Sequence, residues 1–376
     1  MKLFGRRAGR EESRPALSRG GGSWAADGGH RAPSYEAQVR EAYARNAVAQ
    51  RCVRLVADGV GGAPVQASEP ALAALVSPGS GGGACQALLA TVAAQLLLHG
   101  NAFVQVMRDP QGDAAALFAL RPERVEIEPD ADGWPAAYRY RVGAQASRWP
   151  VDPVRPHVIH LKSYHPADDH FGMGCLSAAT GAVAIHNAAS VWNKSLLDNA
   201  ARPSGALVYE PGDGSVLSSE QFGRLRAELD DSFAGSDNAG RPLLLEGGLK
   251  WQALSLSPAD MDFVGLKAAA AREIALAFGV PPMLLGLPGD STHANYREAN
   301  RALWRLTVLP LAGAILGGIA AGLRGWFEGA ALCVDIDRVP ALAEDRQMLW
   351  RSVSGADFLS RDEKRAMLGF GVEAGS

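Results

Sequence analysis

Hydrophobic and polar positions along the chain predict an alternation of helices and strands. Apolar residues recur at helical spacing in 35–58 and in 85–99, and the second segment ends at Gly100. Short runs of strand-forming residues come next, and they are separated by turn pairs such as Asp132-Gly133. These predicted strands cover 102–107, 117–120, 124–127, 138–142 and 158–161. The first section of the chain is therefore predicted to be α+β.

The middle of the chain predicts two long helices around a small mixed segment. One Ala-rich helix is expected over 177–200. Another is expected to start at Ser257-Pro258, with Ser as N-cap and Pro at the first helical position, and to stop at Gly279 before a Pro-Pro pair. The segment 204–256 between them predicts a strand, a helix and two further strands, at 243–246 and 251–256.

The helix inside this mixed segment carries the clearest local signal. Ser218 and Gln221 form a capping box, which satisfies two backbone donors at a helix start. One face of the helix is then lined by Phe222, Leu225, Leu229 and Phe233.

Both ends of the chain differ from its middle. Residues 1–33 are rich in Arg, Gly and Ser and lack periodicity, which predicts a flexible tail. A polar loop over 286–295 leads into a long apolar helix over 296–327. A strand over 332–336 and a short helical C-terminus are expected to follow.

Composition narrows the possible functions. The chain has 376 residues, of which 47% are hydrophobic and 20% are charged, and this is typical of a globular protein. Its net charge of −3 argues against a protein that grips DNA phosphates, because such binding needs a basic surface. Four scattered cysteines without a CxxC pair predict a reduced compartment and no disulfide framework or zinc site.

One segment raises a membrane alternative. Residues 306–323 are uncharged and contain two GxxxG spacings, Gly313 to Gly317 and Gly318 to Gly322. Pro310, four Gly and four Ala lower the hydrophobicity of this run. We favour a helix buried on all sides within an oligomer, and a membrane-anchored protein stays open as an alternative.

Candidate catalytic and metal-binding patterns are weak. A histidine- and aspartate-rich cluster matches no metal-site template, and His157 and His160 should face opposite sides of a strand. Ordinary strand and surface residues are the favoured interpretation of its members, His157, His160, His165, Asp168, Asp169 and His170. Gly172-Met-Gly174 lacks the third glycine of a dinucleotide turn and is interpreted as a simple start of a helix.

Neither GxxxxGK[ST] nor GxSxG occurs in the sequence. We therefore predict no catalytic residue, no metal and no cofactor. A soluble oligomeric enzyme of unknown class remains the second hypothesis.

Several segments together resemble one known family. They are Asn101-Ala-Phe-Val, Leu120-Arg-Pro-Glu-Arg-Val-Glu-Ile, Val158-Ile-His-Leu-Lys, Gly174-Cys-Leu-Ser, Asn199-Ala-Ala-Arg-Pro-Ser-Gly-Ala-Leu, Leu243-Leu-Leu-Glu-Gly-Gly-Leu-Lys-Trp, Leu256-Ser-Pro-Ala-Asp and Ile274-Ala-Leu-Ala-Phe-Gly-Val-Pro-Pro-Met-Leu-Leu-Gly. In their order and spacing, over about 35–370, they resemble the portal proteins (head–tail connectors) of long-tailed bacteriophages. The short chain, and its Ala- and Gly-rich composition, which is typical of a GC-rich genome, further resemble the portals of gene transfer agents and related prophages.

The resemblance implies an α+β portal fold assembled as a ring. It assigns 34–175, with a strand at 332–337, to a wing, and 176–203 and 257–283 to two stem helices. The remaining regions are implied to be a clip at 204–256, a tunnel loop at 284–295, a tunnel helix at 296–327 and a short crown at 339–376.

The resemblance also implies a function and partners. The ring, of twelve copies in the family pattern, would form a channel at one capsid vertex for packaging and ejecting DNA. Its implied partners are the major capsid protein, the large terminase subunit, the head–tail adaptor and double-stranded DNA read without sequence specificity. It would be assembled in the bacterial cytoplasm and reside in a virion or phage-like particle, with no membrane.

Two sets of site residues follow from this resemblance. The near-neutral tunnel loop would face DNA through Asp290, Ser291, Thr292, His293 and Asn295, and basic residues there would slow DNA transit. In the family this loop usually reads Ser-Thr-Tyr-Ser-Asn, whereas here it reads Ser-Thr-His-Ala-Asn. The clip has eight acidic and four basic residues, a net charge of −4, and its candidate docking residues are Glu228, Asp230, Asp231 and Asp237.

Overall fold

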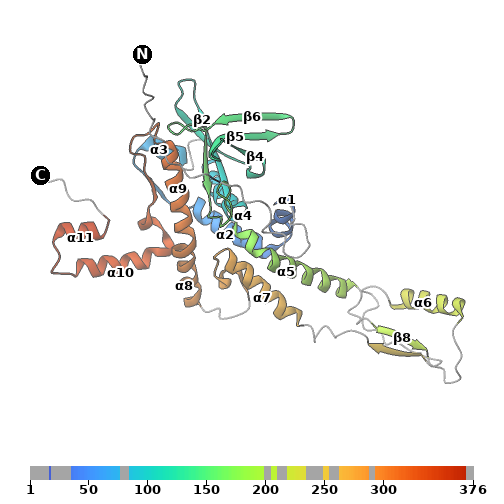
Figure 1. Ribbon diagram of the computed structural model, residues 1–376. Helices are drawn as coiled ribbons and strands as arrows, with labels where there is room; N and C mark the ends of the chain where they lie inside the picture. Colours follow the sequence, from blue (N-terminus) through green and yellow to red (C-terminus); the bar gives the residue numbers. More distant parts are fainter. Residues whose placement is uncertain are drawn as a thin grey trace, which may run out of the picture.

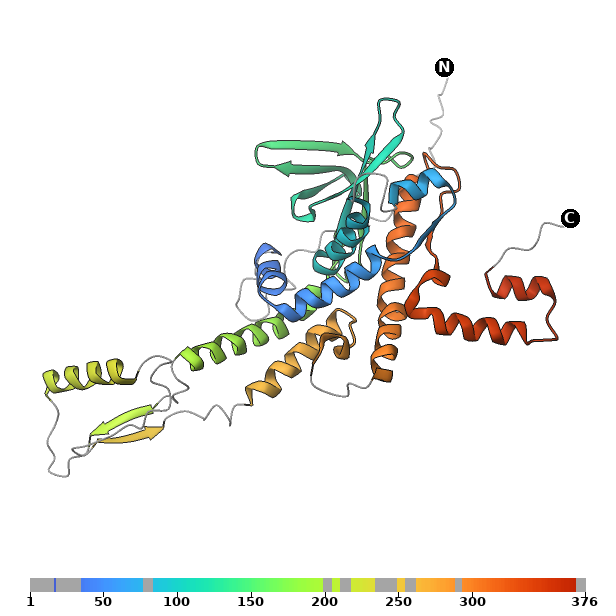
Figure 2. The same ribbon diagram turned by 180° about the vertical axis from the view of Figure 1, so that it is seen from behind.

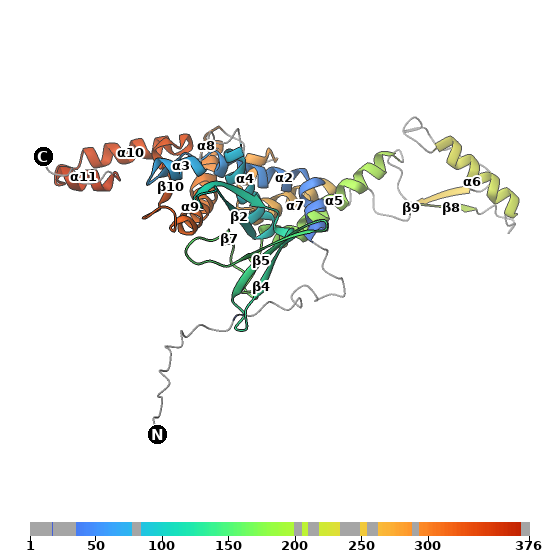
Figure 3. The same cartoon turned by 90° about the horizontal axis from the view of Figure 1, so that it is seen from above.

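The fold has three parts, which Figures 1 and 2 show from opposite sides. The structure is a computed structural model that describes residues 17, 35–76, 84–198, 205–209, 218–233, 249–253, 262–287 and 293–369. An α+β body comprises 35–174 and 293–342, and a long arm comprises 175–277. The C-terminal helices comprise 343–369. The body carries the arm and the C-terminal helices at opposite ends (Figure 3).

The body begins with helices that are shorter than predicted. Instead of one helix over 35–58, the chain forms α1 (Tyr35–Val39), a π-helical turn η1 (Arg40–Ala44) and α2 (Ala47–Gly61). The break occurs at Asn46, which is extended and whose Oδ1 accepts a hydrogen bond from Ala49 N at 3.0 Å. Asn46 is therefore an N-cap that restarts the helix.

Two short elements that the sequence pattern did not predict lie next along the chain. They are β1 (Val65–Ala67) and α3 (Pro70–Val76), and α4 (Ala84–His99) follows them close to the predicted position. A single turn of 3₁₀-helix, η2 (Pro122–Arg124), precedes the second sheet.

Two antiparallel sheets form the rest of the body. Strand β2 (Asn101–Arg108) lies between β3 (Ala114–Leu120) and β7 (Val158–Lys162). The second sheet has the order β4 (Val125–Pro129), β5 (Pro135–Val142) and β6 (Gln145–Pro150). Strand β6 was not predicted, because nearly all its side chains are exposed and it has no apolar alternation. Phe103, Ile127 and Tyr138 pack between the sheets.

The long apolar helix has an inner face in the core of the body. It runs without interruption through α8 (His293–Leu303), the π-helical η5 (Trp304–Val308) and α9 (Leu309–Leu323). By length and composition, 295–323 could cross a membrane, with a mean hydropathy of 2.0. Its residues Ile315 and Ile319, however, are fully buried in the main core cluster. A Cβ at Gly318 or Gly322 would collide with the strand β7 side chains Leu161 and Ile159.

This helix ends four residues before the predicted position. The turn after Leu323 places Gly325 directly against the backbone of Val154, where no side chain would fit. Strand β10 (Leu332–Val334) then pairs with β1, so that Val65 lies opposite Val334. The short turns η6 (Ile336–Arg338) and η7 (Pro340–Leu342) lead into α10 (Ala343–Ser354) and α11 (Arg361–Met367).

The arm is a helical pair that carries a small unit at its tip. Helix α5 (Cys175–Asp198) leads out, and α7 (Phe263–Ala277) runs back beside it. The tip holds β8 (Gly205–Tyr209), α6 (Ser219–Phe233) and β9 (Leu249–Ala253), with β8 and β9 antiparallel. The capping box of α6 is confirmed, because Ser218 N donates to Gln221 Oε1 and Gln221 N donates to Ser218 Oγ.

One predicted helix start in the arm is wrong. Helix α7 begins after Asp262, whose backbone is left-handed (φ 37°) and whose Oδ1 accepts from Gly265 N at 3.0 Å. Asp262 is therefore the N-cap of α7, and Ser257-Pro258, where the start was expected, lies outside the described residues. The predicted stop is confirmed: Gly279 has φ 64°, and a 3₁₀ turn η4 (Pro282–Leu285) follows. The predicted strand at 243–246 lies outside the described residues.

Candidate channel and ring-contact surfaces

The arm exposes apolar side chains that the described part of the chain leaves uncovered. The two helices pack together, and the rings of Trp192 and Phe263 stack with centroids 6.0 Å apart. Large apolar side chains on both helices are nevertheless exposed, namely Ile185, Val191, Trp192, Val264, Leu266 and Leu276. A solvent-facing helix normally carries polar residues on its outer side. So many exposed apolar groups on one slender arm indicate a protein-binding surface.

The start of the long helix is joined to the C-terminal helices by ion pairs. Arg301, which is 15% exposed, donates to Glu344 Oε2 at 2.8 Å and lies 3.3 Å from Asp345 Oδ1. Arg297 donates to Glu344 Oε1 at 2.9 Å, and Arg305 lies 3.7 Å from Asp345. The acidic start of α10 thus offsets three arginines of one helix, which reduces their attraction for phosphate groups.

The predicted channel loop is only partly described. Asp290, Ser291 and Thr292 lie outside the described residues. His293 and Asn295, which were predicted to belong to the loop, form the first turn of α8 instead. The loop is also shorter at its other end, because residues 282–285 form η4. The boundaries 284–295 were therefore too wide, and Asn295 is exposed at the helix start.

The predicted docking residues of the tip are placed on one element. Glu228, Asp230 and Asp231 belong to α6, which is the outermost helix of the arm (Figure 2). Asp237 lies outside the described residues. Glu220 and Arg224 form an i,i+4 ion pair at 2.5 Å near the start of α6.

The histidine-rich cluster contributes to structure through Asn101, which was noted in the sequence only as part of the Asn101-Ala-Phe-Val segment and was given no role. Asn101 is 1% exposed; its Nδ2 donates to His99 O at 3.1 Å and to Gly172 O at 3.0 Å. Its Oδ1 accepts from Gly172 N at 2.8 Å and lies 3.1 Å from His160 Nε2. Asn101 therefore fastens β2 to β7 and to the chain just before α5.

The imidazole of His160, which lies beside Asn101, is uncharged. Its ring stacks on Phe103 with centroids 4.2 Å apart. Burial, with smaller contributions from nearby Lys162, His170 and His99, lowers the pKa of His160 to about 3. Burial beside Phe103 and nearby basic residues both favour the uncharged imidazole.

The other members of the cluster make local turns. His165 Nδ1 accepts from Ala167 N, and Asp168 Oδ1 accepts from His170 N and Phe171 N. Across the residues that the structure describes, no three His, Cys, Asp or Glu side chains are grouped to hold a metal ion. Gly172 and Gly174 pack against Gly100 and Leu98, where a Cβ would not fit. Close backbone packing thus explains the Gly-Met-Gly segment.

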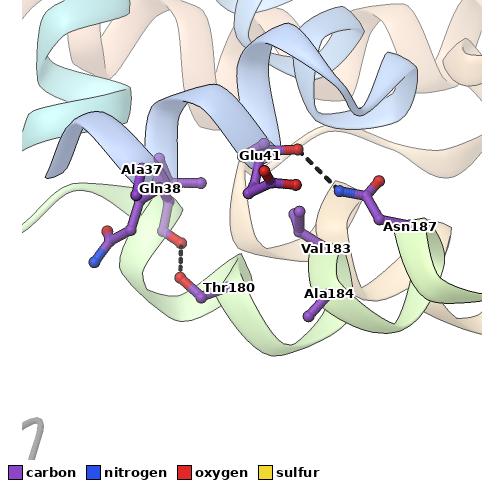
Figure 4. A pocket seen from close by; sticks show the side chains of 9 residues that line it. Ala37, Gln38, Glu41, Thr180, Val183, Ala184 and Asn187 are labelled. Atoms are coloured by element: carbon purple, nitrogen blue, oxygen red, sulfur yellow. Dashed lines mark hydrogen bonds between the residues drawn. The ribbon is translucent and has the colours of Figure 1, made fainter. Parts of the chain in front are cut away.

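A small pocket of about 350 Å³ lies between the N-terminal helices and α5 (Figure 4). Asn187 Nδ2 donates to Glu41 O at 2.9 Å across it, and its walls are largely apolar, with Ala42, Leu176 and Val183 among them. The Glu41 carboxylate is paired with Arg45 at 2.7 Å. The hydroxyl of Thr180, which also lines the pocket, donates to Leu176 O at 3.0 Å, so the polar groups of this pocket are engaged in holding the helices.

Comparisons with known proteins agree on one family. The family model described as "Phage portal protein" matches residues 47–369. A chain in the solved structure "Virion of native gene transfer agent (GTA) particle" is 46% identical, with a TM-score of 0.70, over 92% of this chain and 95% of that one. A chain in "Neck of native GTA particle computed with C12 symmetry" is also 46% identical, with a TM-score of 0.70, over 90% and 94%. An uncharacterized protein of Rickettsia bellii (strain RML369-C) is 40% identical over 88% of each chain.

Proposed function

This chain belongs to the phage portal protein family, and we propose that its copies form the ring-shaped DNA channel at one vertex of a phage-like particle. DNA enters through this channel during packaging and leaves through it during ejection. The observation that carries this function is the match, at 46% identity over nearly the whole chain, to a component of a twelve-fold symmetric particle neck. We take twelve copies as the number in the ring.

We assign the parts of the structure to the parts of such a channel. Residues 35–174, with strand β10, form the wing, and the arm is the stem, with the clip at its tip. The long helix after the loop is the tunnel helix, and the C-terminal helices form a small crown. A purified ring imaged along its axis tests the assembly: a closed ring is expected, and a stable monomer at micromolar concentration would contradict it.

The loop before α8 is proposed to face the passing DNA. Gly286 is left-handed (φ 69°) and ends η4, and Ser291 and Thr292 are small and uncharged. Such groups make weak, exchangeable contacts with phosphates, whereas a ring of lysines would hold them. His293 and Asn295 lie at the start of α8 beside this loop, and Asp290 adds the only fixed charge of 286–295.

A double substitution tests the loop. Ser291→Lys with Thr292→Lys adds two positive charges per copy, which are repeated around the ring. The DNA content of particles should fall, most strongly at low salt, while the ring still assembles. The matched control is Ser291→Gln with Thr292→Gln, which adds similar bulk without charge. Normal packaging in the lysine variant, with normal incorporation into particles, would remove this loop from the DNA path.

The chain is a structural component, and we propose that other proteins supply the chemistry. A packaging ATPase, the large terminase subunit, would dock on the acidic clip through Glu228, Asp230, Asp231 and Asp237. The head–tail adaptor would take its place after packaging, and the major capsid protein would surround the wing. The isolated chain should show no ATPase, nuclease or hydrolase activity, and turnover by a pure preparation would contradict this assignment.

A further inference from the structure

The exposed surfaces of the two stem helices differ in the size of their side chains. On α5 the exposed positions recur at helical spacing through Gly181, Ala184, Ala188 and Val191, and no charged residue occurs between Cys175 and Asn193. On α7 the exposed positions include two leucines, Leu266 and Leu276, and Leu276 is 80% exposed. We call these surfaces the α5 face and the α7 face. The first is mostly shallow, and the second carries projecting side chains.

A ring needs two such faces on each copy. In a cyclic assembly every contact is heterologous, so the surface offered to the next copy differs from the surface offered to the previous copy. A mutual contact between identical faces would give a closed dimer instead. The stem therefore has one surface for each neighbour: the α5 face is apolar, and the α7 face carries apolar side chains with Arg272 and Glu273 between them.

Gly181 leaves room on the α5 face for a close approach by another chain. A glycine inside a helix destabilises it by about 1 kcal/mol relative to alanine. A Cβ at Gly181 would meet nothing within 4 Å, so packing within the chain does not require glycine there. Val191 and Trp192, which lie further along the same face, are 66% and 46% exposed.

The position of each residue along the channel axis decides which residues of neighbouring copies can be in contact. The Trp192–Phe263 stack fixes the register of α5 against α7. Leu276 lies thirteen residues after Phe263, about 20 Å along the helix axis. The same distance back along α5 from Trp192 reaches the turn that contains Gly181. Rotation about the channel axis preserves height, so Leu276 of one copy lies level with Gly181 of the next when the stem is aligned with that axis.

We propose that the ring is closed by this contact: the α7 face of each copy packs on the α5 face of the next, with Leu276 seated over Gly181 and Leu266 beside Val191 and Trp192. Arg272 and Glu273 lie between the two leucines along the α7 face, and their flexible side chains can reach the rim of the contact. This inference rests on the proposed ring. It adds the direction of the contact and the residues that form it.

Cysteine cross-linking tests the pairing. A variant with Gly181→Cys and Leu276→Cys is assembled and oxidised, and its mass is measured before and after denaturation. A ladder of covalently linked copies up to the full ring is expected. The matched control, Gly181→Cys with Val264→Cys, places the second thiol at the far end of α7 and should give no ladder. The parent chain controls for its native cysteines.

The outcomes separate the inference from the ring itself. Absence of any ring in the parent chain would overturn the proposed assembly. Rings that give no ladder, or only links within one copy, would overturn the α5–α7 contact and leave the ring intact. A second variant, Gly181→Leu, should fold as a monomer because its side chain has open space. It should require about tenfold or more protein to assemble, and unchanged assembly would also contradict the contact.

Discussion

Arg301 of the tunnel helix and Glu344 of α10 form a hydrogen-bonded ion pair, with Nη2 and Oε2 2.8 Å apart. Because Arg301 is largely buried and Glu344 also accepts from Arg297, this pair is stronger than an exposed one. Glu344→Gln should loosen α10 from the tunnel helix by about 1–2 kcal/mol. Faster hydrogen exchange at the amides of α10 would report this loss.

Glu328→Gln is a suitable control for that experiment. Glu328 is also an exposed glutamate, and it makes no ion pair within the described part of the chain. Its substitution should leave exchange in α10 unchanged. Equal exchange in the two variants would show that the ion pairs do not hold the crown helices.

A pH dependence of stability follows from His160. In the folded chain its pKa is about 3, whereas in the unfolded chain it takes up a proton near 6.5. Between these pH values the unfolded state binds more protons, so this contribution is fully present above about pH 6.5 and is lost as the pH falls. The slope from one such group is at most about 1.4 kcal/mol per pH unit.

His160→Gln isolates this contribution, since glutamine can still approach Asn101 but does not titrate. Urea unfolding at about pH 7, 6 and 5 should give a flatter dependence for the variant than for the parent chain. Parallel curves for the two proteins would mean that His160 is protonated in the folded state as readily as in the unfolded state.

The glycines of α9 should respond to alanine in opposite ways. At Gly322 a Cβ would press on Ile159, and overpacking of this kind costs about 1–3 kcal/mol. At Gly317 a Cβ meets nothing within 4 Å, so alanine should stabilise the isolated chain by up to about 1 kcal/mol. Denaturant unfolding of the unassembled chain, at a concentration too low for rings to form, measures both effects, and a stabilising Gly322→Ala would contradict the close packing on β7.

The acidic clip should be sensitive to charge reversal. Asp230→Lys with Asp231→Lys changes the local charge by four units per copy and should weaken motor docking, because complementary charges across an interface would become repulsive. Binding of the large terminase subunit should fall at low salt and recover partly at high salt. Unchanged binding at both salt concentrations would remove these residues from the interface.

The long helices and most strands were predictable from the sequence because their apolar periodicity is strong. The pattern failed where local signals were weak or tertiary contacts decided the outcome. Strand β6 has no buried face, and Asn46 splits a helix because its side chain caps the next turn and reaches Asn187 on α5. The family resemblance gave the function, which composition alone did not give.

For the candidate sites, the sequence predicted which segments are involved but not the contacts of individual residues. Asn101 and Arg301 were missed because their roles depend on partners 71 and 43 residues away, which no local pattern indicates. The loop boundary was placed three residues too late, because the polar start of α8 at His293 carries no apolar periodicity that would mark it as helical.

Strand β1 pairs with β10, which joins residue 65 to residue 334. The whole stem, clip and tunnel helix therefore lies within one closed loop of the chain. During synthesis the body can complete its fold only after nearly the entire polypeptide has left the ribosome, because such distant pairing forms late. A chain that ends before residue 332 would lack this closure. The pairing of β1 with β10 thus makes completion of each subunit's body depend on a strand that is synthesised after the stem, the clip and the tunnel helix.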